Sequence, residues 1–326
     1  MTFIHSLRTS ALLAVWCAWF AVVPAHAQAP YPSKPIRLIV PFPPGGGAEA
    51  TARLVANKMA ESMGQAVVVE TRAGAGGNIG TDYVARAQPD GYTLLLATNG
   101  MAIQPHLQKL TWDPIKDFTP VGLVAVYALV IAVHPSVPAQ NLSELVAYAK
   151  AHPRQMSYGS SGSGGPLHMG AELFRAHAGV DLLHVPYKGN APMTIALLSG
   201  EINMVFDSPV GPLPNIRAGK VRALATTGKR RSSSLPEVPT VIESGLPGFD
   251  YESWNGIVAP AGTPKDIVAR LSNEVAKAVA SPEVRERLMA LGYEPRVAKT
   301  DEFAALIAAD LNRFGRVVKE VGMKLD

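Results

Sequence analysis

The sequence predicts an α/β protein of two lobes, joined by two crossing segments with a ligand cleft between them. Apolar β-rich runs alternate with helical patterns along the chain, which favours parallel sheets covered by helices. Loops of glycine and other small residues follow several of these strands, at the sheet edge where ligands bind in such folds. The chain has 326 residues, of which 48% are hydrophobic, enough for roughly two domains of about 150 residues each.

The first residues are expected to be removed from the mature protein. An apolar run, Ala11–Val23, follows Arg8 and precedes a small-residue site, Ala25–Ala27. This pattern predicts a secretory signal peptide, residues 1–27, cleaved after Ala27. The run is short for a membrane span. Because Cys17 is the only cysteine, the mature chain needs no disulfide, which favours export to a bacterial periplasm.

The first lobe is predicted to comprise residues 28–126 and 252–326. An apolar strand, Ile36–Phe42, leads through prolines and Gly45–Gly47 into a helix, Ala48–Met63, with apolar residues at helical spacing. The strand Gln65–Thr71 leads in the same way through Gly74–Gly80 into a second helix. The other elements expected here are the helix Thr81–Ala87 and the strands Thr93–Thr98 and Trp254–Pro260. Three more helices are expected after them. The first starts with Thr263 as N-cap and Pro264 at N1, the second is Pro282–Leu291, and the third starts at Thr300.

The second lobe is predicted to comprise residues 127–251. Phe118–His134 is long for one strand and has a weak point near Ala125–Ala128, so we expect it to pass from one lobe to the other. Gly228–Tyr251 is rich in Ser, Pro and Gly and reads as the return connection. The elements expected between them are the helices Asn141–Ala151 (capped by Asn141 and Glu144), Leu167–His177, Ala191–Leu198 and Gly211–Arg217, and the strands Met156–Ser160, Leu182–Tyr187, Ile202–Phe206 and Val221–Thr226.

The motifs of common enzymes are incomplete in this chain. Neither glycine loop supplies the lysine of a P-loop, and a dinucleotide fingerprint from Gly74 would need glycine where Ile79 stands. Ser161 lies in no G-x-S-x-G elbow, and the histidines lack metal-ligand spacing. We therefore predict no catalytic residue, no cofactor and no metal. The net charge of +4 comes from dispersed basic residues, which argues against a nucleic-acid partner.

Three loops remain as candidate binding elements: Gly45–Gly47, Gly76–Gly80 and Ser160–Gly165. Backbone N–H groups and hydroxyls at helix starts bind carboxylates without a full counter-charge. Three such loops around one cleft suggest a ligand with two or more carboxylates, clamped when the lobes close. Alternatively, the glycines only allow tight turns.

The residues of these loops belong to longer stretches with a family resemblance. The stretches are YPSKPIRLIVPFPPGG, GAGGNIGTDYVARAQPDGYTLLLAT, VPYKGNAPMTIALLSGEINMVFDS and ALATTGKRRSSSLPEVPTVIESGLPGFDYESWNGIVAPAGTP. Over essentially the whole mature chain, the sequence resembles the substrate-binding proteins of tripartite tricarboxylate transporters, the Bug family. The resemblance implies a type II periplasmic binding protein that captures a di- or tricarboxylate, an aromatic acid or an acidic amino acid. A monomer would deliver this ligand to one large and one small integral-membrane transporter subunit.

The resemblance also implies ligand-binding positions in both lobes. Tyr187 is explained equally well by a packing role. Asp207 is more readily explained by orienting loops than by touching the ligand. Ala48 and Glu49 replace the Thr-Asp pair common in the family, so the ligand is expected to differ from that of a typical member. The implied ligand-binding residues are Pro44, Gly45, Gly46, Glu49, Gly77, Asn78, Gly80, Thr98 and Asn99 in lobe one, and Ser160, Ser161, Gly162, Tyr187 and Asp207 in lobe two.

Two other functions compete with transport. A ligand sensor that engages a signalling partner would have the same sequence features, whereas an exported α/β hydrolase would need the missing nucleophile motif. We predict hinge closure near Ala125–Ala128 and Gly248–Ser253 for either non-catalytic function.

Overall fold

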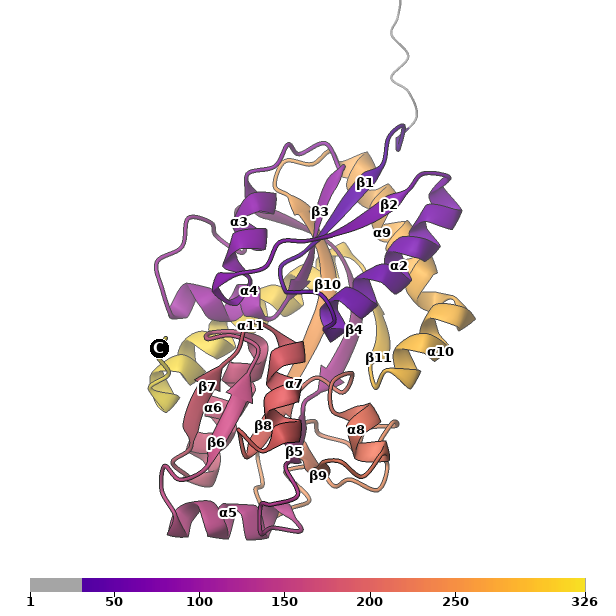
Figure 1. Cartoon of the computed structure of the whole chain (residues 1–326). Helices are drawn as coiled ribbons and strands as arrows, with labels where there is room; N and C mark the ends of the chain where they lie inside the picture. Colours follow the sequence, from indigo (N-terminus) through magenta and orange to yellow (C-terminus); the bar gives the residue numbers. More distant parts are fainter. Residues whose placement is uncertain (1–30, 326) are drawn as a thin grey trace, which may run out of the picture. The chain divides into compact units, whose positions relative to one another are not determined.

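The computed structural model describes residues 31–325, so the predicted signal peptide lies outside the described residues. The chain divides into a unit Met1–Ser33 and a compact unit Lys34–Asp326. The second unit contains two β-sheets with helices packed around them (Figure 1). Within residues 31–325, no helix combines the length and hydropathy that a membrane span requires.

The first sheet has six strands in the order β11-β4-β10-β3-β1-β2. β1 pairs in parallel with both β2 and β3, whereas β10 runs antiparallel to β3 and β4, and β11 antiparallel to β4. The parallel arrangement predicted for the first three strands is thus confirmed. The other half of the sheet is antiparallel, because β10 returns from the second sheet. The strands are β1 (Ile36–Val40), β2 (Val67–Thr71), β3 (Thr93–Thr98), β4 (Phe118–Ala128), β10 (Glu252–Pro260) and β11 (Glu294–Ala298).

Helices cover both faces of this sheet. In Figure 1, α2, α9 and α10 lie on one side of the first sheet, and α3, α4 and α11 on the other. Phe303 of α11 packs edge-on against Trp254 of β10, and both belong to the buried core. The helices are α2 (Gly47–Met63), α3 (Asn78–Ala85), α4 (Gly100–Ile103), α9 (Lys265–Ala280), α10 (Pro282–Ala290) and α11 (Thr300–Val321), with the short 3₁₀ turns η1 (Ala75–Gly77) and η2 (Gln104–His106).

The second sheet has five strands in the order β7-β6-β8-β5-β9. β6 pairs in parallel with β7 and β8, and β5 runs antiparallel to β8 and β9. The predicted cap of α5 is confirmed, because the Glu144 amide donates to Asn141 Oδ1 over 2.9 Å. The elements are β5 (Val130–Val133), β6 (Ser157–Ser160), β7 (Leu183–Pro186), β8 (Met204–Asp207), β9 (Arg222–Thr226), α5 (Leu142–Ala151), α6 (Pro166–Ala178), α7 (Asn190–Ser199) and α8 (Leu213–Arg217).

The two segments that connect the sheets are hydrogen-bonded to each other. β4 ends at Ala128 and β5 begins at Val130, so Leu129 is the link on the outward path. The Leu129 amide donates to Thr227 Oγ1 over 2.8 Å, and the Thr227 amide donates to the Leu129 carbonyl over 3.0 Å. The Tyr251 amide then donates to the Thr227 carbonyl over 3.1 Å. Thr227 therefore ties the outward and return segments together where the chain changes sheet.

Two local expectations from the sequence are wrong. α9 begins at Lys265 with Pro264 as its N-cap, and Thr263 instead donates its hydroxyl to the Pro260 carbonyl over 2.8 Å. β11 was not expected, because EPRVA contains a proline and polar residues and shows no apolar alternation. It lies at the edge of its sheet, where such a composition is tolerated.

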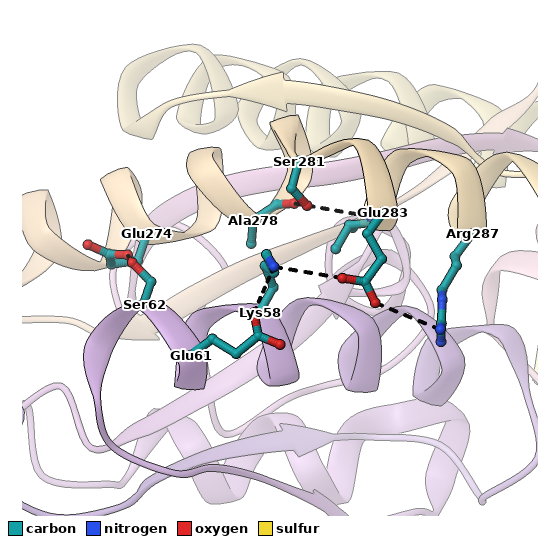
Figure 2. A network of polar contacts seen from close by, with 9 residues as sticks. Lys58, Glu61, Ser62, Glu274, Ala278, Ser281, Glu283 and Arg287 are labelled. Carbon is teal, nitrogen blue, oxygen red and sulfur yellow. Dashed lines mark hydrogen bonds and ion pairs between the residues drawn. The ribbon is translucent and has the colours of Figure 1, made fainter.

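A polar network orients α2 against α9 and α10 (Figure 2). The Lys58 ammonium lies 2.6 Å from the Glu61 carboxylate and 3.7 Å from that of Glu283. The Ser62 hydroxyl bonds to the Glu274 carboxylate, which is almost fully buried. These contacts fix the helix whose opposite, N-terminal end reaches the cavity described next.

Candidate functional site

A central cavity lies where loops of the two sheets meet. Its empty space of about 390 Å³ includes open solvent, and only about 30 Å³ of it has room for a water molecule, so the cavity is nearly closed in this form. It is lined by Phe42, Gly46, Gly47, Ala48, Thr98, Tyr127, Ser161, Pro166, Leu167, Asn190, Ser208 and Tyr293. We call this set the central cavity throughout.

The N-terminal ends of α2, α6 and α7 all contribute to the central cavity. Their N-cap residues are Gly46, Gly165 and Gly189, and none of the three helices has a side-chain cap. Helix starts without a cap leave backbone N–H donors free and carry the positive end of the helix dipole. Three of them around one cavity make a site for a negatively charged group.

The side chains around this cavity are neutral. Among residues 31–325, those that line it include no Lys, Arg, Asp or Glu. Hydroxyls of Thr98, Ser161 and Ser208 alternate with the apolar surfaces of Phe42 and Leu167. An anion bound here would be held by backbone dipoles and hydroxyls, with an apolar surface for its carbon skeleton.

Tyr293 brings a buried hydroxyl to the start of α2. A Cβ added to Gly47 would lie only 1.8 Å from the Tyr293 hydroxyl, so glycine is what makes room for it. Tyr293 is 1% exposed, and its hydroxyl lies near the Ser208 hydroxyl, which interacts with it without the geometry of a full hydrogen bond. Burial raises the pKa of Tyr293 well above its ordinary value, so the hydroxyl keeps its proton. It is a neutral, buried hydroxyl at the start of α2.

Asp207 lies behind the cavity wall and organises two residues that line it. Asp207 Oδ1 accepts from Asn190 Nδ2 over 2.6 Å and from the Ser208 hydroxyl over 3.3 Å. Burial raises the pKa of Asp207 to about 7, and these hydrogen bonds offset only part of that effect. Asp207 itself does not line the central cavity.

The ligand positions implied by the resemblance fall into three groups. Gly46, Thr98 and Ser161 line the central cavity. Gly77, Gly162 and Tyr187 line an outer groove of about 490 Å³ that also includes Ser161, and Asn78 lines a pocket beside Thr98 and Gly77. The positions that line none of these spaces are Pro44, Gly45, Glu49, Gly80, Asn99, Ser160 and Asp207.

The Glu49 side chain points back to the glycine loop that precedes its helix. Its carboxylate accepts from the Gly45 amide over 2.7 Å and pairs with Arg53 at 2.6 Å. The hydrogen bond from Gly45, followed by that from Arg53, lowers the pKa of Glu49 against the opposing effect of its burial. Glu49 thus fixes the glycine loop and leaves the helix N-terminus open.

Replacing Glu49 with alanine should loosen this loop and lower the free energy of unfolding by about 1 kcal/mol, because the Gly45 amide loses its acceptor. Urea unfolding would measure the change. Arg53→Ala is the matched control, since it removes only the exposed partner and should cost about 0.5 kcal/mol or less. Equal losses in the two variants would contradict a capping role for Glu49.

The side chains of Asn99 and Ser160 make hydrogen bonds to other buried residues of the protein. Asn99 Nδ2 donates to the Tyr251 hydroxyl over 3.3 Å, and its Oδ1 accepts from Ser253 over 2.7 Å, which joins β3 to the return segment. Ser160 Oγ lies 2.7 Å from His184 Nε2. That pair resembles a nucleophile and base, but Ser160 is fully buried and lines neither the cavity nor the groove.

Gln104 joins the glycine loops of the two sheets at the rim. Its Nε2 donates to the Gly164 carbonyl over 3.0 Å and to the Gly76 carbonyl over 3.5 Å. Its Oε1 accepts from Asn78 over 3.1 Å. This buried amide holds the loops in contact, and a Cβ at Gly76 would lie 2.6 Å from the Ser163 carbonyl. Close approach of the loops therefore requires glycine there.

Sequence reasoning included Gly47 in a candidate loop but did not single out Tyr127, Asn190, Ser208 and Tyr293. Asn190 and Ser208 adjoin stretches that carry the family resemblance, and Gly47 is in the predicted loop, so a local signal existed for them. No local pattern marks Tyr293, which follows α10 and reaches the cavity only through the antiparallel pairing of β11 with β4.

Comparison with known proteins shows matches to one protein family along most of the chain. The model of the tripartite tricarboxylate transporter family receptor matches residues 51–323. Protein BugT of Bordetella pertussis is 36% identical over 321 residues, which cover 98% of this chain and 98% of BugT.

Solved structures agree with this match. The periplasmic binding protein BugD superposes with a TM-score of 0.86 at 36% identity, covering 91% of this chain and 100% of BugD. Rpa4515 of R. palustris, solved with adipate, has a TM-score of 0.87 at 35% identity over 91% of this chain and 100% of its own. MatC of Rhodopseudomonas palustris, with bound malate, has a TM-score of 0.82 at 33% identity, covering 88% of this chain and 100% of MatC.

Proposed function

Because this chain belongs to the tripartite tricarboxylate transporter receptor family, of which Bug proteins are members, we propose that it captures one small organic acid and delivers it to membrane transporter subunits. Members of this family are periplasmic solute-binding proteins and not enzymes. The adipate and malate complexes of two similar proteins support a carboxylate as the ligand. The same comparisons support a periplasmic location, and we propose that residues 1–27 are cleaved on export.

The observation that carries this proposal is the meeting of three glycine-capped helix N-termini at a cavity with no charged side chain. A carboxylate needs several donors when it leaves water, and unpaired backbone N–H groups supply them. A cation or a phosphate-rich ligand would find no matching charged side chain here. The ligand group that fits is a carboxylate on a small, partly apolar skeleton.

The proposed capture involves closure of two lobes, residues 28–126 with 252–326 and residues 127–251. Hinge motion near Ala125–Ala128 and Gly248–Ser253 would separate α2 from α6 and α7 and open the cavity. The Gln104 hydrogen bond to Gly164 would break in the open form, because it joins the two lobes. We propose that a monomer in its closed form engages one large and one small integral-membrane subunit.

A thermal-shift screen tests this function. At 100 times its dissociation constant, a ligand should add about 2.7 kcal/mol to the free energy of unfolding. The screen should include citrate, C4 dicarboxylates, aromatic acids and acidic amino acids, each beside its amide as a matched control. We expect a shift with at least one acid and none with its amide. No shift with any acid, or equal shifts with acid and amide, would contradict carboxylate capture.

A further inference from the structure

A groove beside the first sheet lies apart from the central cavity. It has a volume of about 830 Å³, and it shares no lining residue with the central cavity or the outer groove. Its lining residues come from α3, from the beginnings of β1 and β3, and from the residue that follows β2 (Figure 1). We call it the cationic groove, and the residues that define it are Lys34, Arg37, Arg72, Ile79, Tyr83 and Arg86.

This groove carries more positive than negative side chains. Four Lys and Arg residues line it against two Asp residues, which leaves a net charge of +2. Each of the two acids is paired with one of the cations. Asp90 lies 3.5 Å from the Lys34 ammonium, and Asp82 lies 2.9 Å from the Arg86 guanidinium. The excess positive charge therefore belongs to the two arginines that remain.

These two arginines, Arg37 and Arg72, lie over one aromatic ring. Their guanidinium carbons are 5.5 and 3.7 Å from the centroid of the Tyr83 ring, so they are separated by no more than the sum of these distances. Arg37 donates to Thr93 Oγ1 over 3.0 Å, and Arg72 is 3.9 Å from the Glu70 carboxylate. A guanidinium has five N–H donors, and these contacts use few of them.

Tyr83 is a fixed platform for this pair of charges. It is partly buried and packs against the core of the first sheet, so its ring cannot leave the groove without exposing that core. The stacking of both guanidinium groups on this ring holds two positive charges near each other. Because like charges repel, an anionic partner that pairs with both of them is favoured.

The groove suits carboxylates that a protein segment presents. Guanidinium groups bind carboxylates through two parallel hydrogen bonds, so two of them fit two neighbouring acidic side chains. Arginine and tyrosine are also the residues that protein interfaces favour. Ile79 lines the same groove, is 55% exposed, and offers an apolar contact beside the charges. A concave surface of this kind favours a protein segment over a flat lipid surface.

We propose that the cationic groove docks an acidic segment of the membrane transporter subunits. This inference rests on the proposed function, because it names a surface through which delivery takes place. All the lining residues lie within residues 34–93, on one side of the predicted hinge. The contribution of the groove to docking is therefore the same in the open and closed forms, and a preference for the closed form comes from other surfaces.

Charge reversal of the two arginines tests this surface. The probe is the large and small transporter subunits of the source organism in phosphatidylcholine nanodiscs, and biolayer interferometry measures docking of the purified protein. Arg37→Glu combined with Arg72→Glu should weaken docking by about 10-fold or more, by the same factor with and without the captured acid. Calorimetry should show unchanged affinity for the acid found by screening, since the groove is separate from the cavity.

Arg217→Glu combined with Arg230→Glu is the matched control. It makes the same change of charge at two exposed positions outside the groove, and it should dock within about 2-fold of wild type. Should the first double variant not fold, Arg72→Glu alone changes a side chain that is 41% exposed and should weaken docking by about 3-fold or more.

The possible failures are distinguishable. If the charge-reversed protein docks like wild type, if the control variant loses as much, or if the loss appears only with the acid bound, the inference is overturned while the proposed function stands. Nanodiscs of phosphatidylcholine and phosphatidylglycerol without subunits test for a lipid partner, and binding to them as tight as to the subunits overturns the inference too. If wild-type protein binds an acid but docks to no pair of subunits, delivery fails together with the inference.

Discussion

Gly47→Ala should weaken acid binding by about 100-fold or more, roughly 2.7 kcal/mol. The added methyl would lie 1.8 Å from the Tyr293 hydroxyl and 2.9 Å from its Cζ, so the buried ring must move. Forcing an atom into a packed site costs about 1–3 kcal/mol, and the displaced start of α2 no longer presents its amides to the ligand. Titration calorimetry with the acid found by screening measures the loss, and thermal unfolding shows the accompanying drop in stability.

Gly165→Ala is the matched control for this prediction. Gly165 is also an N-cap at the cavity, but its added Cβ would meet only the Gly162 carbonyl at 3.5 Å, an ordinary contact. This variant should bind within a few-fold of wild type. The pair Gly47→Ala with Tyr293→Phe should recover part of the loss, since the closest clash is with the hydroxyl oxygen. Unchanged affinity in Gly47→Ala alone would refute the proposed role of the α2 start.

The stability of the protein should depend on pH through Asp207. Burial raises the pKa of Asp207 to about 7 from an ordinary value of 3.8. The folded state therefore binds a proton that the unfolded state has lost between about pH 4 and pH 7, so this group's contribution to stability falls as pH rises across that window. The difference of 3.2 between about 7 and 3.8 corresponds to roughly 4 kcal/mol in total.

Asp207→Asn isolates the effect, because the amide oxygen can still accept from Asn190 and Ser208 and the side chain has no charge to bury. The free energy of unfolding of the variant, minus that of wild type, should increase between pH 4 and pH 7 and then stay constant. Urea unfolding at several pH values measures this difference, in which all other titrating groups cancel. Asp113→Asn, at a partly exposed position, is the control and should show no such rise. Parallel curves for Asp207→Asn and wild type would contradict the prediction.

The sequence predicted the parts of the site that local patterns encode. The step from β1 through glycines into α2 was expected at Ala48, one residue from its start at Gly47, because the apolar spacing and the glycines are adjacent in the chain. The passage of the chain between the two sheets was placed at Ala125–Ala128, and β4 ends at Ala128. Strand and helix periodicities are local properties of the sequence, and the elements that they predict are present in the structure.

What the sequence could not predict is how polar side chains are paired. Asn99 and Ser160 sit at the ends of strands, as ligand-binding residues do, yet partners distant in the chain satisfy both of them. Tyr293 shows the converse, since it is brought to Gly47 by the packing of an edge strand with an atypical sequence. Such pairings depend on the order and direction of strands, which the alternation of elements does not specify.

The glycine caps of α2, α6 and α7 imply a division of labour within the site. In the proposed site, main-chain amides bind the carboxylate, and a substitution that leaves the helix starts in place does not remove them. Discrimination among acids would then depend on the side chains that line the cavity. Substitution of those side chains would therefore change which acid binds, while the backbone donors for a carboxylate stay in place.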